Sequence, residues 1–290
     1  MINLTQEILE LIRLAATDLP EDVEGALIEA AEQEQPGSAA EGALKTIIEN
    51  VALARNDSTP ICQDTGTPIF YVFHPQGWST RSLRTQIEDA VEQATMAAYL
   101  RPNAVDTLSG KNSGNNLGDV YFPSIHFQEV DQDALTIELI LKGGGCENVG
   151  TQYALPNTQL GAGRDLEGVR KVILDAVHKA QGKGCAPGIL GIAIGGDRGS
   201  SYIASKETLF RQLDDEHPDS SLAEFEGRIT EEANLLGIGP MGFGGRTTVL
   251  GTKISSLHRL PASYFVTVSY MCWAYRRRKM VWTDGNVKYS

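Results

Sequence analysis

Three of the four cysteines stand beside turn-forming or polar residues, where strands are expected to begin or end: Cys62, Cys185 and Cys272. Strand ends converge at one rim of an α/β fold, so cysteines far apart in the chain can meet there. Thiolates are soft ligands, which suits them to zinc or to an iron–sulfur cluster. Three protein ligands would leave one coordination position open, as in catalytic metal sites. From spacing alone, buried small side chains remain the alternative interpretation.

The overall composition favours a folded protein that does not bind nucleic acid. The chain has 290 residues, of which 41% are hydrophobic and 21% charged, and its formal net charge is −12. So acidic a chain is a poor candidate for covering phosphates or an anionic membrane. No apolar run approaches the roughly 20 residues needed to span a bilayer, and the first residues do not resemble a signal peptide. We therefore expect a cytoplasmic globular protein, with too few cysteines for a disulfide scaffold.

Other patterns speak against several common sites. The five histidines form no HxxxH pattern, which gives a zinc hydrolase little support. The glycine-rich stretch at residues 237–245 lacks the Walker lysine–hydroxyl pair and the dinucleotide spacing, so we interpret it as a wall of the metal pocket. The charged run from Arg276 to Lys279 is expected to be a solvated face of the protein.

The elements that must position these residues are predicted to form a mixed α/β (α+β) fold. Residues 1–57 show apolar residues at helical spacing and predict a helical lead. Residues 58–290 are predicted to form the core that carries the cysteines at its strand ends. With no convincing internal boundary, we expect a single domain over residues 1–290. Strands are expected at residues 69–73, 120–127, 135–141, 188–194, 247–254 and 264–270, and helices at 79–100, 167–181, 200–213 and 221–236.

Seven segments, in order along the chain, resemble one known family. They lie at residues 60–66, 100–103, 110–112, 142–145, 185–187 with 194–196, 236–240, and 272–274 with 276–277. Together they are similar to the α chain, or N-terminal domain, of the class I fumarases and the L-tartrate dehydratases, which are oxygen-sensitive [4Fe-4S] hydro-lyases. The resemblance covers essentially the whole chain.

The resemblance implies a [4Fe-4S] cluster held by three cysteines, and the matching positions are Cys62, Cys185 and Cys272. The fourth iron of such a cluster has no protein ligand, and it would act as a Lewis acid toward a substrate carboxylate and the departing hydroxyl. Cys146 matches a position where many fumarases carry serine, so we expect it not to be a ligand.

The resemblance also implies a binding site for a small dicarboxylic acid. Gln63 and Asp64 would contact substrate, with Asp64 taking part in proton transfer, although an Asp before Thr-Gly would otherwise form a simple Asx turn. Arg101 would bind a carboxylate through its planar fork; otherwise it would be a surface residue. Gly144 would let the backbone approach substrate closely, the alternative being a tight turn.

The chain departs from the family at one position. Many members carry histidine immediately before a proline about twelve residues ahead of the third cysteine, whereas Leu260 stands before Pro261 in this chain. His258 lies two residues earlier and is a candidate substrate-binding replacement. This departure leaves the substrate and one polar group of the site open.

Too few residues follow Cys272 to hold the smaller C-terminal domain that completes the site in this family. The resemblance therefore implies a separate β subunit in a hetero-oligomer. The expected reaction is the reversible dehydration of (S)-malate to fumarate, with L-tartrate dehydration as the first alternative. A non-catalytic iron–sulfur sensor and a structural zinc site are the remaining alternatives.

Overall fold

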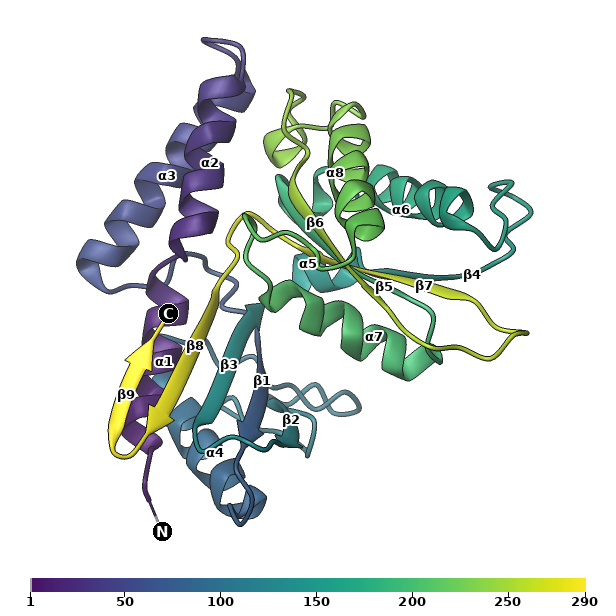
Figure 1. Cartoon of the computed structure of the whole chain (residues 1–290). Helices are drawn as coiled ribbons and strands as arrows, with labels where there is room; N and C mark the ends of the chain where they lie inside the picture. The colour runs from purple at the N-terminus through teal and green to yellow at the C-terminus, as the bar shows by residue number, and fades with distance from the viewer. Residues whose placement is uncertain (1) are drawn as a thin grey trace. The chain divides into compact units, whose positions relative to one another are not determined.

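The structure is a computed structural model that describes residues 2–290 (Figure 1). Its α-helices are α1 (Thr5–Thr17), α2 (Glu21–Gln33), α3 (Ala39–Asp57), α4 (Thr80–Met96), α5 (Gly144–Asn148), α6 (Leu166–Ala180), α7 (Arg198–Glu207) and α8 (Ser220–Asn234). Its strands are β1 (Thr67–His74), β2 (Ser124–Glu129), β3 (Leu135–Lys142), β4 (Thr151–Ala154), β5 (Gly188–Ile194), β6 (Val249–Ser256), β7 (Phe265–Met271), β8 (Arg277–Thr283) and β9 (Asn286–Tyr289).

The chain forms two compact units, each assembled from separate stretches of sequence. Unit 1 contains residues 1–20, 49–144 and 274–290, of which the structure describes all but the first. Unit 2 contains residues 21–48 and 145–273. The chain passes from unit 1 into unit 2 after Pro20 and again after Gly144, and it returns to unit 1 after Ile48 and after Trp273. The expectation of a single domain over residues 1–290 stays a prediction.

Unit 1 is built on a mixed sheet with the strand order β2-β1-β3-β8-β9. Strand β1 pairs with β2 in parallel and with β3 antiparallel, so that Thr67 lies opposite Lys142. Helices α1 and α4 pack on each other and, with β1 and β3, bury a continuous apolar core that includes Ile12, Phe70 and Ile87. Burying several such side chains at roughly 1.5–3 kcal/mol each is the main term holding this unit together.

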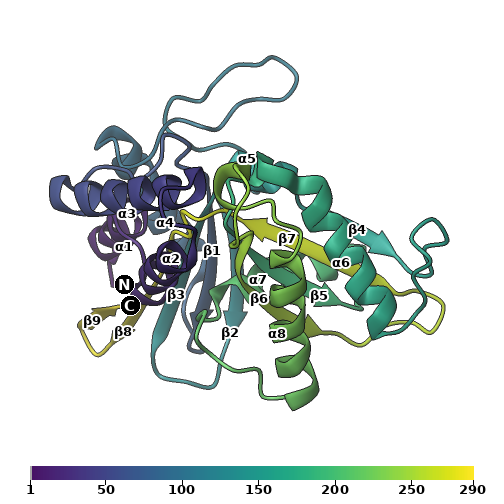
Figure 2. The same cartoon turned by 90° about the horizontal axis from the view of Figure 1, so that it is seen from above.

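Unit 2 is built on a four-stranded mixed sheet with the order β4-β7-β5-β6. Helices α6 and α8 cover one face and α7 the other, as Figures 1 and 2 show. Strand β5 lies between β7 and β6 and is covered on both faces, and every one of its residues is buried. This position explains why residues 188–194 read as an unbroken apolar run in the sequence.

Side-chain caps fix where several helices begin. The Ser79 hydroxyl accepts a hydrogen bond from the backbone N–H of Ser82 (3.3 Å) at the start of α4. Helix α7 begins with a capping box, in which the Asp197 carboxylate accepts a hydrogen bond from the N–H of Ser200 and the Ser200 hydroxyl accepts one from the N–H of Asp197.

The fold class predicted from the sequence is confirmed: three helices precede mixed sheets. Strand β2 begins at Ser124 rather than at residue 120, because residues 119–122 form a turn in which Phe122 N–H donates to Asp119 O (3.0 Å). The sequence did not predict the short elements α5 and β4, nor the final hairpin β8–β9.

The expectation of a solvated face from Arg276 to Lys279 is wrong. Arg276 and Arg277 are 1% and 8% exposed, and the Arg278 guanidinium donates to the Asp18 carboxylate (2.8 Å). Residues from Arg277 onward form β8, which pairs with β3, so the charged side chains belong to an inner strand of the unit 1 sheet. Of these four residues, Lys279 is the exposed one, and its ammonium group lies 3.5 Å from the Glu138 carboxylate.

Among residues 2–290, no helix combines the length and the hydropathy that crossing a membrane requires.

Candidate functional site

Cys185 and Cys272 lie at the same edge of the unit 2 sheet. Strand β5 begins three residues after Cys185, and Cys272 directly follows the end of β7. The two strands are antiparallel, with Ile189 opposite Met271, so the start of one meets the end of the other. The backbone N–H of Trp273 donates to the carbonyl oxygen of Cys185 (3.3 Å), which fixes the two cysteine segments side by side.

Tyr270 packs beneath the turn that carries Cys185. Its side chain is buried, and Cβ atoms placed on Gly184 and Gly188 would lie 2.5 and 2.2 Å from carbon atoms of its ring. Burial, and then proximity to the ionisable thiols of Cys272, Cys146 and Cys185, raises the pKa of the Tyr270 phenol above its usual value. No sequence pattern singled out Tyr270; the glycines on either side of Cys185 are the signal that points to a bulky neighbour.

Cys146 belongs to the same unit and also lies near enough to Tyr270 to affect the pKa of its phenol, and its sulfur contacts Met271. It lies in α5, is buried, and its Sγ is 3.9 Å from the Sδ of Met271. Neighbouring residues of a strand point to opposite faces, so Met271 and Tyr270 present their side chains to different sides of β7. Contact with a thioether in the core is typical of a structural cysteine. The expectation that Cys146 is not a metal ligand stays a prediction.

The glycine-rich stretch predicted to line the pocket also lies at the edge that carries Cys185. Met241 N–H donates to Ala186 O (2.8 Å), and Gly188 N–H donates to Thr248 O (2.9 Å). Directly after this stretch, the backbone N–H groups of Arg246 and Thr247 donate hydrogen bonds to the buried Glu34 carboxylate at 2.9–3.0 Å. These bonds fix the C-terminal end of the stretch.

In unit 1, the carboxylate of Asp64 joins two segments that are far apart in the chain. Asp64 precedes β1, and Gly144 follows the end of β3, its antiparallel neighbour. The Gly144 N–H donates to Asp64 Oδ2 (2.7 Å), and the Gly66 N–H donates to Asp64 Oδ1 (3.0 Å). The second bond is the Asx turn that the Asp-Thr-Gly sequence predicted, so Asp64 forms the turn and also binds the β3 end.

Arg101 and Gln63 belong to the same polar group in unit 1. Arg101 Nη1 donates to the carbonyl oxygen of Gln63 (3.3 Å), and the Arg101 N–H donates to Thr65 Oγ1 (3.0 Å). Asn103 Nδ2 donates to Thr65 Oγ1 and to Gly66 O at 3.2 and 3.3 Å. The side chains of Gln63, Asp64 and Arg101 are exposed, whereas Thr65 is buried beneath them. The structure thus brings together four predicted site residues: Gln63, Asp64, Arg101 and Gly144.

His258 lies elsewhere. It follows β6, which runs parallel to β5, so it stands at the far end of the unit 2 sheet from Cys185 and Cys272. At about 3.3 Å per residue, the length of β5 separates the two edges by roughly 20 Å. The structure therefore does not bring His258 to the cysteines of its own unit. Leu260, in the same loop, is 73% exposed.

Within residues 2–290, no three or more His, Cys, Asp and Glu side chains are grouped so that they could hold a metal ion. Cys62 is half-buried in the loop before β1 of unit 1, and Cys185 and Cys272 belong to unit 2. The two unit 2 cysteines nevertheless fit a soft metal or cluster, because both sulfur donors come from backbone segments fixed side by side.

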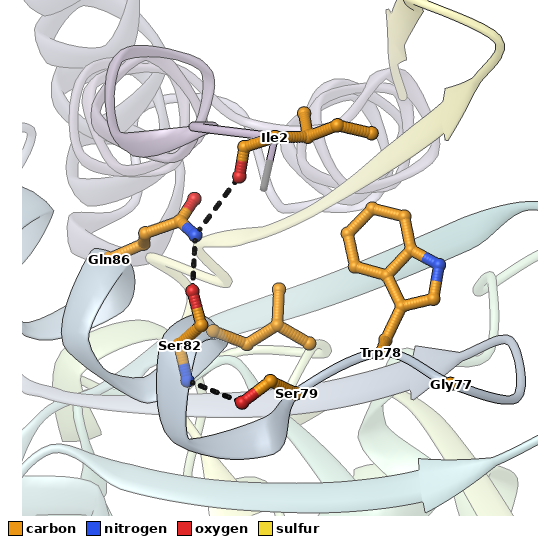
Figure 3. A pocket seen from close by; sticks show the side chains of 7 residues that line it. Ile2, Gly77, Trp78, Ser79, Ser82 and Gln86 are labelled. Atoms are coloured by element: carbon orange, nitrogen blue, oxygen red, sulfur yellow. Dashed lines mark hydrogen bonds between the residues drawn. The ribbon is translucent and has the colours of Figure 1, made fainter.

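A pocket of about 460 Å³ in unit 1 contains none of the candidate residues (Figure 3). Gln86 stands at its side and donates through Nε2 to Ile2 O (3.2 Å) and to Ser82 Oγ (3.1 Å), while its Oε1 accepts from the Leu4 N–H. These bonds fasten the start of the chain to α4. The pocket thus lies where the N-terminal segment docks.

Comparison with known proteins identifies the family. The family model described as fumarate hydratase (Fumerase) matches residues 5–281. A Geobacillus stearothermophilus protein provisionally named class I fumarate hydratase is 48% identical over 280 residues, which cover 96% of this chain and 54% of that protein. The chain therefore spans about half the length of this relative.

Two further relatives match over nearly their whole length. A Methanocaldococcus jannaschii protein provisionally named L(+)-tartrate dehydratase subunit alpha is 34% identical over 95% of this chain and 96% of that protein. The L(+)-tartrate dehydratase subunit alpha of Escherichia coli K12 is 31% identical over 95% of this chain and 89% of that protein. The chain therefore belongs to the fumarate hydratase family, as its seven segments predicted.

Proposed function

We propose that this chain is the α subunit of a two-component [4Fe-4S] hydro-lyase that reversibly dehydrates (S)-malate to fumarate. The observation that carries the proposal is the 48% identity, over 96% of the chain, to a relative named class I fumarate hydratase. The grouping of Gln63, Asp64, Arg101 and Gly144 at one edge of unit 1 supports it, since a dicarboxylic acid needs a cationic and polar clamp.

The proposed cluster ligands are Cys62, Cys185 and Cys272. The register of β5 and β7 supports the pair in unit 2, and the position of Cys62 directly before Gln63 and Asp64 supports the third. When bound, a cluster with three protein ligands supplies an iron atom that acts as a Lewis acid toward a carboxylate and a departing hydroxyl. Cys146, packed against Met271, is left out of the ligand set.

The residues of unit 1 would bind and orient the substrate. The guanidinium of Arg101 offers a planar pair of donors to one substrate carboxylate, and the contact with Gln63 O holds the arginine close to Asp64. Each oxygen of the Asp64 carboxylate accepts one backbone N–H and keeps further lone pairs for a substrate hydroxyl or a proton. The main chain at Gly144 has no side chain to keep substrate away from that carboxylate.

The partner in this proposal is a β subunit that completes the site. The chain spans 54% of the Geobacillus relative but 89–96% of the two relatives named subunit alpha. A polypeptide that corresponds to the remaining part of the longer relative is therefore the proposed partner. It would exclude water from the substrate and contribute further acid, base and cationic groups.

L-tartrate dehydration is the second candidate, because two relatives matched over nearly their full length are named L(+)-tartrate dehydratase subunit alpha. Leu260 stands where many members of the family carry histidine, so malate and L-tartrate both stay candidate substrates. A sensor that kept the cluster and lost the chemistry would need no Arg101–Asp64 clamp, so we place it third.

The test is anaerobic reconstitution with iron and sulfide, followed by assays with the β chain on malate, fumarate and the tartrate isomers. A broad visible absorption band and bound sulfide indicate the cluster, whereas zinc without sulfide would favour a structural zinc site. Turnover of (S)-malate and fumarate supports the first proposal, and turnover of L-tartrate alone replaces it with the second. Cluster loading without turnover of any of these acids would support the third alternative, a non-catalytic iron–sulfur sensor.

A further inference from the structure

The ring of Tyr270 and the turn that carries Cys185 are matched in shape. Tyr270 lies on β7 opposite Leu190 of β5, two residues before Cys272, and it is 2% exposed. A Cβ on Gly188 would lie 2.2 Å from ring atom Cζ and 2.3 Å from the phenolic oxygen, and a Cβ on Gly184 would lie 2.5 Å from Cε1. The turn therefore rests directly on the ring, with one glycine on each side of Cys185.

The backbone conformation does not explain these two glycines. Neither Gly184 nor Gly188 has a positive φ, whereas Cys185 between them is left-handed with φ 55° and ψ 63°. Glycine is thus needed at both positions for space beneath the turn and not for backbone freedom. The strained residue is the cysteine itself, and such a conformation persists only where the surroundings hold it.

Two hydrogen bonds hold the turn on its β6 side. Ala186 O accepts from Met241 N–H, and Gly188 N–H donates to Thr248 O, so both bonds run toward β6 and the segment before it. On the β7 side, the Trp273 N–H donates to Cys185 O at 3.3 Å, a long bond. The Tyr270 ring is the large rigid group that fills the β7 side of the turn.

We propose that Tyr270 is a positioning residue, whose ring holds the Cys185 turn against β7 and so sets Cys185 beside Cys272 before any metal binds. The inference rests on the proposed function only in treating the two cysteines as cluster ligands. The ring, and not the hydroxyl, carries this role, because the ring atoms make the closest approaches to Gly184 and most of those to Gly188. Tyr270→Phe should therefore keep the arrangement, and Tyr270→Leu should lose it.

A thiol cross-link tests the geometry without metal. In a Cys62→Ser, Cys146→Ser background, only Cys185 and Cys272 remain to react with dibromobimane, which fluoresces when both its arms are bound. We expect similar cross-linking with tyrosine and phenylalanine at position 270. With leucine we expect a rate about tenfold lower, as when only a tenth of the molecules hold the paired arrangement. Equal rates in folded tyrosine and leucine variants would overturn the proposal.

Two controls separate positioning from general loss of stability. Phe225→Leu removes another buried ring of unit 2, on α8, and should leave cross-linking unchanged at temperatures where circular dichroism shows folded protein. If Tyr270→Leu does not fold, Tyr270→Met retains more volume but no ring, and it should still cross-link more slowly than Tyr270→Phe. Equal cross-linking by the methionine and phenylalanine variants would also overturn the proposal.

Iron loading of the full chain completes the test. After anaerobic reconstitution, Tyr270→Phe should bind as much iron and sulfide as the unsubstituted chain, and Tyr270→Leu should bind clearly less. Full loading of the leucine variant refutes the positioning role while leaving the proposed function intact. Failure of the unsubstituted chain itself to take up iron refutes the cluster, while the metal-free cross-linking result still decides the role of the ring.

Discussion

The candidate residues of the two units occupy equivalent places but are held in different ways. In each unit the candidates other than His258 collect at the sheet edge where one strand begins and its antiparallel neighbour ends: β1 and β3 in unit 1, β5 and β7 in unit 2. Cys185 and Cys272 are fixed by main-chain register and by a buried ring. Gln63, Asp64 and Arg101 are exposed and are held by polar contacts between loops.

This difference matches the demands of two kinds of ligand. A metal or cluster needs donors whose positions do not change, which a sheet edge with close packing provides. A substrate must enter and leave, and groups on loops can adjust around it. We therefore expect substitutions at the unit 2 edge to alter metal content or folding, and substitutions of Gln63, Asp64 or Arg101 at the unit 1 edge to alter substrate binding.

The largest expected effect comes from the proposed ligands. Cys62→Ser, Cys185→Ser and Cys272→Ser should each lose the cluster and its activity, because serine does not replace a thiolate as an iron ligand. Cys146→Ser should keep both, since this cysteine packs against Met271. Iron and sulfide analysis checks the prediction. Normal loading in any of the first three variants, or loss only in the Cys146 variant, would contradict the assignment.

A glycine at the unit 2 edge should be sensitive to a single methyl group. In Gly188→Ala, the added Cβ would meet the Tyr270 ring at 2.2 Å, and overpacking of this kind costs about 1–3 kcal/mol of unfolding free energy. The control is Gly227→Ala on α8, where nothing lies within 4 Å of the added Cβ and a more stable helix is expected. Urea unfolding measures both. Equal stability of the two variants would mean that the turn does not rest on the ring.

At the unit 1 edge, Arg101→Lys should weaken substrate binding without loss of the cluster. Lysine keeps the charge but loses the planar pair of donors. We expect kcat/KM to fall by about 10- to 100-fold, roughly 1.4–2.7 kcal/mol, mainly through KM. Arg81→Lys, an exposed arginine of α4, is the matched control. Kinetics that match those of the control would remove Arg101 from the site.

The smallest expected effect is on the pH dependence of the free energy of unfolding, and it too differs between the two units. Hydrogen bonds from the Ser200 N–H, the Ser200 hydroxyl group and the Gly199 N–H lower the pKa of Asp197, which caps α7. A lowered folded-state pKa gives stability that is present above the unfolded value of about 3.9 and is lost as the pH falls through the folded-state value. The uncharged cap of α4, Ser79, does not titrate.

The stability deficit of Asp197→Ala should therefore shrink between pH 7 and pH 3, whereas that of Ser79→Ala should stay constant. Urea unfolding at both pH values, with each variant compared to the unsubstituted chain, measures the two deficits. A deficit of Asp197→Ala that does not depend on pH would show that the charge of this cap contributes nothing.

Much of the secondary structure could be predicted because its signals are local. The apolar runs before and after the cysteines could be recognised from a few neighbouring residues. The charged start of β8 could not be recognised as a strand, because the guanidinium of Arg278 is bound by the carboxylate of Asp18, which lies near the other end of the chain. Similarly, a contact such as Gly144 N–H to Asp64 joins residues 80 positions apart and depends on how β3 pairs with β1.

The candidate site residues came from the family resemblance, and the structure shows which of them lie close together. It brings Asp64, Arg101 and Gly144 together in unit 1, and it places Cys185 beside Cys272 in unit 2. His258 stands at the far edge of its sheet because β6 runs parallel to β5, a direction that periodicity in the sequence does not reveal. Tyr270 was missed because its partners are glycines, which carry no side-chain pattern of their own.

The most direct test of the account is anaerobic turnover by the cluster-loaded chain, measured with and without the β chain. We expect turnover of (S)-malate, fumarate or L-tartrate only when both chains are present, because the exposed groups of unit 1 need a partner to exclude water and to supply the remaining acid and base. Comparable turnover by the chain alone would contradict the two-component reading. No turnover by the loaded pair on any of the three would contradict the proposed hydro-lyase function itself.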